Sequence, residues 1–94
     1  MGFSAQTVLE QLGGRRFIAM TGSNNFVKGE NFIRFKVHRA QKSIKYVKIT
    51  LTAMDTYDME FMTRSGKHIR TVDGIYADQL QETFTENTGL ETRL

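Results

Sequence analysis

Hydrophobic and polar side chains alternate along three stretches in the middle of the chain, residues 32–38, 45–52 and 57–62. In a β-strand, successive side chains point to opposite faces, so a period of two predicts strands. One face of these strands is apolar and the other polar, which is typical of an antiparallel sheet with one wet face. The predicted inward-facing residues are Ile33, Phe35, Val37, Val47, Ile49, Leu51, Tyr57, Met59 and Phe61.

Two shorter stretches are predicted to complete the sheet. Residues 16–21 (RFIAMT) are predicted as a strand that ends at the turn cluster 22–25, with a short extension at 26–27. Ser65-Gly66 predicts a hairpin turn into a last strand over residues 67–72. Because strands adjacent in sequence usually pair, about five strands in a meander are expected.

A helix is predicted near each end of the sequence. Ser4 is a good N-cap for a helix over residues 5–12, which carries a narrow apolar stripe and ends at Gly13-Gly14. Asp73 is the predicted N-cap of a second helix over residues 74–88, with Gly89 left-handed at its end. The apolar face of the sheet needs a cover, and these helices supply it. The fold class is therefore α+β, with both helices packed on one face.

Length and composition restrict the possibilities further. Ninety-four residues fit a single domain, residues 1–94. The sequence has no cysteine for a disulfide or a thiolate metal site, and no apolar run long enough to span a bilayer. The first residues lack a basic segment followed by an apolar one, so no signal peptide is expected. These features favour a cytoplasmic protein that does not associate with membranes.

Charge is distributed unevenly along the chain. Residues 14–70 contain twelve Lys and Arg against four acidic residues, whereas residues 71–94 contain five acidic residues and one Arg. The net charge of +3 therefore combines a basic segment of +8, an acidic segment of −4 and Glu10. Such asymmetry informs expectations about partners and solubility, and it does not specify the fold.

Three stretches resemble a known family: LGGRRFIAMTG, ITLT-x-x-DTY and YADQL-x-x-x-F-x-x-x-TGL. The sequence is similar there to small uncharacterised proteins encoded by bacteriophages, prophages and other mobile elements, and the similarity covers most of the chain. The resemblance implies a bacterial or phage setting and an accessory role. It carries no activity, catalytic residue or ligand over to this chain.

The polar face of the predicted sheet is a candidate nucleic-acid interface. Its cations would neutralise phosphates, and a tyrosine offers a surface on which an unpaired base stacks. The alternative is a solvated face on which Lys48 lies opposite Glu60, and the neighbouring Asp58 would repel a phosphate backbone. The candidate residues, including the connection 39–45, are Arg34, Lys36, Arg39, Lys42, Lys45, Tyr46 and Lys48.

The acidic second helix is a candidate docking surface for a basic protein. Asp78, Glu82 and Glu86 recur every four residues and form one charged stripe. A solvated outer helix face is the alternative interpretation. A second copy of the chain offers the required basic surface too, so a homodimer is one possible arrangement.

Catalytic chemistry is not indicated by the sequence. His38 and His68 lie on different predicted strands, and a metal site would need a carboxylate such as Asp58 or Glu60 beside them. No nucleophile is accompanied by a positioned base, and no catalytic residue, metal site or cofactor is predicted.

Two hypotheses follow. The first is a non-enzymatic accessory protein of a phage or mobile element that binds a bacterial host or phage protein, and the alternative is a nucleic-acid-binding module.

Overall fold

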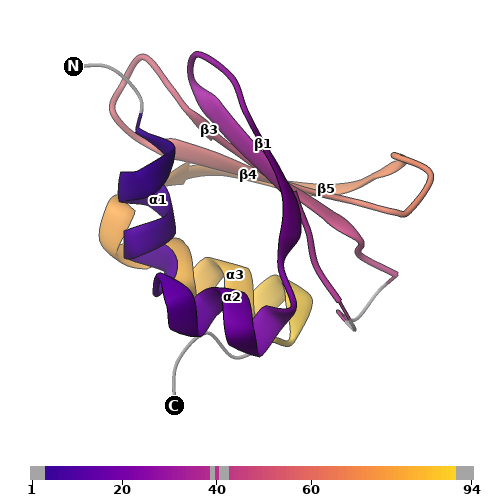
Figure 1. The fold of residues 1–94 in the computed structure, drawn as a ribbon. Helices are drawn as coiled ribbons and strands as arrows, with labels where there is room; N and C mark the ends of the chain where they lie inside the picture. The colour runs from indigo at the N-terminus through magenta and orange to yellow at the C-terminus, as the bar shows by residue number, and fades with distance from the viewer. Residues whose placement is uncertain (1–3, 39, 41–42, 91–94) are drawn as a thin grey trace.

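The computed structural model describes residues 4–38, 40 and 43–90. Five antiparallel strands form one sheet in the order β1-β2-β3-β4-β5, and the helices lie on one face of it (Figure 1). The predicted α+β fold, a meander with N-terminal and C-terminal helices, is confirmed. The strands are β1 (Asn24–Lys28), β2 (Phe32–Lys36), β3 (Tyr46–Leu51), β4 (Tyr57–Met62) and β5 (His68–Ile75). The helices are α1 (Ala5–Leu12), α2 (Arg15–Thr21), the 3₁₀ helix η1 (Ala77–Gln79) and α3 (Leu80–Thr88).

Helix α1 begins and ends as its sequence predicts. The side chain of Ser4 accepts a hydrogen bond of 3.2 Å from the backbone N–H of Thr7, which satisfies one of the free donors of the first turn. Val8 and Leu12 lie one turn apart and are fully buried. Gly13 closes the helix at φ 125°, a conformation that glycine adopts without steric strain.

The predicted strand over residues 16–21 is wrong, because this segment forms the helix α2. Phe17 and Thr21 lie one helical turn apart and are buried, while Ala19, which a strand would place beside them, is exposed. The Thr21 hydroxyl donates to the carbonyl oxygen of Phe17 at 2.7 Å, a bond typical of threonine in a helix. Six residues are too few to distinguish the alternation of a strand from a helical pattern. The packing of Phe17 against the core favours the helix.

The first strand instead begins after the predicted turn. Only a short extension was expected at residues 26–27, but β1 spans Asn24–Lys28 and pairs with β2. The pairing is irregular between Asn24 and Val27, where Asn25 takes φ 55°. This β-bulge accommodates an extra residue in the edge strand. The sheet keeps the predicted number of strands, although its first strand lies further along the sequence.

The predicted start of the second helix is also wrong. Asp73 does not cap a helix, because β5 continues to Ile75, which is buried and pairs with Tyr57. The chain then passes through η1, and α3 begins at Leu80. The burial of Ile75 between the sheet and the helices explains the longer strand. The predicted end is confirmed: Gly89 is left-handed at φ 75° and donates to the carbonyl oxygen of Thr85.

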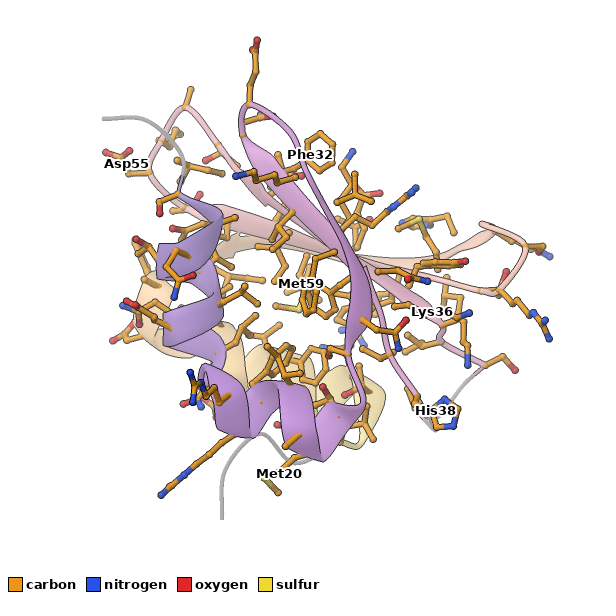
Figure 2. All side chains as sticks on the ribbon, viewed as in Figure 1. Met20, Phe32, Lys36, His38, Asp55 and Met59 are labelled. Carbon is orange, nitrogen blue, oxygen red and sulfur yellow. The ribbon has the colours of Figure 1, made fainter. Side chains whose placement is uncertain are left out.

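The core lies between the sheet and the helices. The predicted inward alternation of β2, β3 and β4 is confirmed for the residues at the centre of the sheet, including Met59 (Figure 2). Phe17 contacts both Phe35 and Phe84, with ring centroids 5.5 Å and 5.0 Å apart in edge-to-face geometry. Buried side chains of this size contribute about 1.5–3 kcal/mol each. The fully buried core residues are Val8, Leu12, Phe17, Phe35, Val37, Val47, Ile49, Met59, Phe61, Leu80 and Phe84.

The first and last helices, α1 and α3, contact each other on the helical face of the sheet. The side-chain amide of Gln81 on α3 donates to the carbonyl oxygen of Leu12 at 2.9 Å, across 69 residues of sequence. This bond satisfies one of the free carbonyls at the end of α1. None of the helices within the described part of the chain is long and apolar enough to cross a membrane.

Candidate nucleic-acid interface

The face of the sheet opposite the helices is the outer face, and strand alternation decides which side chains it carries. The residues between the buried positions of β2, β3 and β4 point to it. Most of them are half-buried by their neighbours on the sheet. They are Phe32, Arg34, Lys36, Tyr46, Lys48, Thr50, Asp58, Glu60 and Met62.

The strand register arranges the outer face in rows that cross the sheet, and the charge changes from row to row. Lys36, Tyr46, Met62 and His68 are paired successively across β2 to β5 and contain no carboxylate. This set is the first row. In the second row, Arg34 and Lys48 are followed by Glu60 and Thr71. In the third row, Phe32 and Thr50 are followed by Asp58. Summed over these residues with histidine neutral, the first and second rows each have a net charge of +1 and the third row has −1, and carboxylates occur from the second row onward.

The meander collects cations at the end of the sheet beside the first row. In antiparallel strands, the ends of β2 and β4 lie beside the starts of β3 and β5. Residues 36–46 and 62–70 include these strand ends and the connections between them, and they contain no aspartate or glutamate. We call this region the cationic end. Its described Lys and Arg residues are Lys36, Lys45, Arg64, Lys67 and Arg70.

The opposite end of the sheet is acidic. Glu30 lies in the turn between β1 and β2, Asp55 in the turn between β3 and β4, and Asp73 near the end of β5. Figure 2 shows Asp55 far from Lys36 and His38, which lie toward the other end of the sheet. Lys28 is the basic residue at this acidic end. The asymmetry that the sequence shows along the chain thus becomes an asymmetry in space across the sheet.

Backbone hydrogen bonds extend the sheet beyond the strand ends at the cationic end. The N–H of Val37 donates to the carbonyl oxygen of Lys45, and the N–H of Lys45 donates to that of Met62, both at 2.8 Å. Lys45 is therefore fixed between the ends of β2 and β4. These two bonds fix the backbone of Val37 and Lys45 at the cationic end.

Two cations of the outer face lie over aromatic rings. The guanidinium carbon of Arg34 lies 5.7 Å from the ring centroid of Tyr46, and the ammonium nitrogen of Lys48 lies 4.6 Å from that of Phe32. Both distances are in the range of cation–π contacts. Lys48 pairs with Glu60 in the register, as predicted, but its ammonium group extends toward β2, away from β4.

The structure brings together most residues of the predicted interface. Arg34, Lys36, Tyr46 and Lys48 share the outer face, and Lys45 adjoins them. Arg39 and Lys42 lie outside the described residues.

The hairpin between β4 and β5 adds cations that were not among the predicted interface residues. Arg64, Lys67 and Arg70 are exposed and belong to the cationic end. The predicted Ser65-Gly66 turn contained the necessary signal, because it places the hairpin beside the start of β3 once a meander is assumed.

The predicted acidic docking surface is divided between two helices. Asp78 lies in η1, whereas Glu82 and Glu86 lie on α3, so only the latter two are joined by one turn of α-helix. All three are exposed. Ala77–Thr88 contains no basic residue, so this surface carries negative charge alone.

The histidines do not form a metal site. His38 follows β2 and His68 begins β5, with β3 and β4 between them. Three strand spacings of about 4.8 Å separate β2 from β5, whereas zinc ligands lie about 2 Å from the metal. Among the residues that the structure describes, no group of three or more histidine, aspartate or glutamate side chains is arranged to hold a metal ion.

A groove of about 340 Å³ lies between α1 and the edge strand β1. Of the residues that line it, Lys28 is the one with an ionisable side chain, and it is exposed. Ligand sites combine an apolar pocket with several converging polar groups. The groove has one charged group, whereas the outer face has several, so the outer face is the better candidate for a binding site. The groove is lined by Ala5, Gln6, Leu9, Phe26, Lys28 and Ile33.

No protein-family model, no curated protein and no solved structure matches this chain. The resemblance to proteins of phages and mobile elements therefore stays a prediction, and the function is inferred from the geometry of the outer face and of the two ends of the sheet.

Proposed function

We propose that this protein is a non-enzymatic nucleic-acid-binding module that holds a phosphate backbone along the cationic end of its sheet. The observation that carries the proposal is the concentration of cations at one end of the meander, in segments that contain no acidic residue. A surface of one charge sign attracts a polyanion and releases the counterions condensed on it. The proposal favours the nucleic-acid hypothesis over the protein-binding hypothesis.

The ligand crosses the strands along the first row. A backbone that crossed the sheet along the second or the third row would meet a carboxylate on β4, Glu60 or Asp58. A backbone along the first row passes from Lys36 to His68 without meeting a carboxylate. Adjacent strands lie about 4.8 Å apart, so the path from β2 to β5 is about 14 Å long. Measured along the axis of a duplex, where each strand has one phosphate per about 3.4 Å, this length corresponds to about four phosphates.

A charge-reversal experiment tests the proposal. Lys36→Glu combined with Lys67→Glu places two negative charges at the cationic end, and binding of a labelled oligonucleotide is measured by fluorescence anisotropy at low and moderate salt. The matched control is Arg15→Glu combined with Lys28→Glu, which changes the net charge equally at exposed positions elsewhere. We expect the first pair to weaken binding at least about tenfold, because each charged hydrogen bond contributes about 1.5–3 kcal/mol.

The control decides between a localised interface and general attraction to a basic protein. Equal losses in both double variants would show that net charge alone drives binding. Absence of binding to single-stranded and double-stranded oligonucleotides at low salt would refute the proposal. A control pair that stays within about twofold of the wild type supports it.

The sequence resemblance supports an accessory role for a phage or mobile element in the bacterial cytoplasm. There the module would bind host or element nucleic acid without altering it covalently. The chain has the small size expected of a binding module, with one sheet and one helical layer. This setting is tested by locating the tagged protein in cells that carry the element.

A second candidate function is docking to a basic protein through the acidic helices. The observation that favours it is the exposure of Asp78, Glu82 and Glu86 on a segment without basic residues. The partner is a host or phage protein, or the cationic end of a second copy of this chain. Replacing all three acidic residues with lysine is expected to abolish capture of the partner from nuclease-treated lysate. If the partner is a second copy, the same variant is expected to lose self-association in sedimentation experiments. Unchanged capture and unchanged association would exclude docking at this surface.

A further inference from the structure

The strand β1 is an open edge of the sheet that carries apolar side chains. It is the first strand in the order β1-β2-β3-β4-β5, and each of its residues is exposed. Phe26 and Val27 are 38% and 45% exposed, with Phe26 on the helical side, against Phe35, and Val27 on the outer face, opposite Arg34. None of the helices drawn in Figure 1 passes in front of β1. An exposed apolar edge is a template for pairing with another strand.

The other edge of the sheet, β5, has the features by which natural edge strands avoid such pairing. Its pairing with β4 is irregular at two places, and it carries the exposed charges of Arg70 and Asp73. In β1 the irregularity lies between Asn24 and Val27, and the strand pairs regularly with β2 from Val27 to Lys28. Of the two edges, β1 is therefore the better template.

The register with β2 determines which backbone groups of β1 are free to pair. The N–H of Gly29 donates to the carbonyl oxygen of Phe32, so the backbone groups of Gly29 point toward β2. In an antiparallel pair this orientation alternates from residue to residue. The N–H and C=O groups of Val27 therefore point toward β2 as well. Those of Phe26 and Lys28 point away from β2, to the open edge.

We infer that β1 pairs antiparallel with β1 of a second copy of this chain, about a two-fold axis at Val27. In this register Val27 lies opposite Val27 of the second copy, and Phe26 lies opposite Lys28. The N–H and C=O groups of Phe26 and Lys28 then pair with those of the second copy, and the axis repeats the contact. Two sheets thereby become one continuous sheet, with both helical layers on the same side.

Side chains favour this register over the neighbouring ones. A pair centred on Lys28 would place two ammonium groups directly opposite each other, which is destabilising. A pair centred on Phe26 would bring Lys28 opposite Asn24, beyond the bulge at Asn25 that interrupts the strand. In the register centred on Val27, Lys28 lies beside the Phe26 ring of the second copy, within reach of a cation–π contact. Both side chains line the groove between α1 and β1.

Charge complementarity supports the same pairing. β1 runs from the cationic end of the sheet, where Asn24 pairs with Lys36, to the acidic end, where the following turn contains Glu30. Antiparallel pairing brings the start of one β1 beside the end of the other. The cationic end of each copy therefore lies next to the acidic end of its partner, whereas a parallel pairing would place like charges together.

A charge-exchange experiment tests the register. Val27→Lys and Val27→Glu each place like charges opposite each other at the two-fold axis, where the two side chains lie close together. Each variant alone is expected to weaken self-association at least about tenfold. An equimolar mixture of the two variants is expected to restore it, because the lysine introduced into one chain then faces the glutamate introduced into the other.

Sedimentation velocity measures self-association at protein concentrations up to about 1 mM, since a short strand pair is a small and weak interface. Met54→Lys and Met54→Glu are the matched controls, because Met54 is 84% exposed in the turn between β3 and β4. Both controls are expected to associate as the wild type does, alone and mixed. Because the pair dissociates at low protein concentration, oligonucleotide binding measured there reports on the monomer.

Amide hydrogen exchange gives a second measurement of the pairing. As the protein concentration rises, exchange of the Phe26 and Lys28 amide protons is expected to slow, because they become bonded to the second copy. The amide of Gly29, which is bonded to Phe32 within one chain, is the internal reference and is expected to stay unchanged.

The outcomes distinguish this pairing from other contacts. Recovery in the mixed Val27 variants, with slowed exchange at Phe26 and Lys28, supports it. A protein that stays monomeric at every concentration would overturn it, and so would equal losses in the Val27 and Met54 variants. Association that the mixture does not restore would overturn the register. Growth into open-ended polymers would indicate pairing of β1 with β5 instead, because a head-to-tail contact does not close into a dimer.

Discussion

Replacing Phe17 tests the assignment of residues 15–21 as a helix. Phe17 is fully buried, and its ring makes edge-to-face contacts with Phe35 and Phe84 at centroid distances of 5.5 Å and 5.0 Å. Phe17→Leu keeps an apolar side chain of similar size but removes both aromatic contacts. Each such pair contributes about 0.5–1.5 kcal/mol beyond the burial of area. We therefore expect the free energy of unfolding to fall by about 1–3 kcal/mol.

Urea denaturation followed by circular dichroism measures this change. For a small domain, the free energy of unfolding falls by about 1–3 kcal/mol per molar urea, so a loss of about 2 kcal/mol shifts the midpoint by about 1 M. The control is Ala19→Lys. A strand would place Ala19 on the same face as Phe17, whereas α2 exposes it. Surface substitutions usually change stability by no more than about 0.5 kcal/mol.

The comparison of the two variants is decisive for α2. If Ala19→Lys destabilises the protein as much as Phe17→Leu, residue 19 faces the core and the helix is refuted. If Phe17→Leu leaves the midpoint unchanged, the aromatic contacts do not stabilise the core as inferred. Only a large effect at Phe17 with a small effect at Ala19 agrees with the structure.

Two further predictions concern a backbone turn and the interface. Gly22 takes φ +66°, and an added Cβ would lie 2.9 Å from the Cβ of His38, so Gly22→Ala should lower the free energy of unfolding by about 2–3 kcal/mol. Gly66→Ala, at φ +87° with open space around it, should cost about 1 kcal/mol in the same urea experiment, and a larger loss at Gly66 would contradict the steric reasoning. Lys36→Gln should reduce the slope of log affinity against log salt by about 0.7–0.9, the contribution of one phosphate contact, and Lys28→Gln should leave it unchanged. Equal slopes for both variants would exclude a phosphate contact at Lys36.

Strand alternation made the central part of the fold predictable. In β2, β3 and β4 the apolar residues follow a period of two over enough positions to exclude a helix. The segment 16–21 was too short for this distinction, because Phe17 and Thr21 fit a helical turn as well as a strand face. Asp73 has the chemistry of an N-cap, but pairing of Ile75 with Tyr57 keeps the chain extended beyond it. Tertiary packing, which local sequence does not specify, decided both cases.

The charges of the candidate interface were visible in the sequence, but their arrangement was not. The distribution of charged residues along the sequence predicted a basic segment between residues 14 and 70. The separation into a cationic and an acidic end arises from the meander, which alternately returns the chain to the same two ends. The opposition of Arg34 and Lys48 depends on the strand register, which the long connection between β2 and β3 leaves undetermined from sequence.

The hydrogen bond between Gln81 and Leu12 has a consequence for synthesis on the ribosome. The apolar side of α1, with Val8 and Leu12, is covered in part by α3, which is translated after all five strands. At about 5–20 residues per second, roughly 3–14 s separate the synthesis of these two bonded residues. During that interval the nascent chain presents apolar side chains that the finished protein buries. A ribosome-associated chaperone would therefore meet a transient binding site on α1, and packing of α3 against α1 would close it.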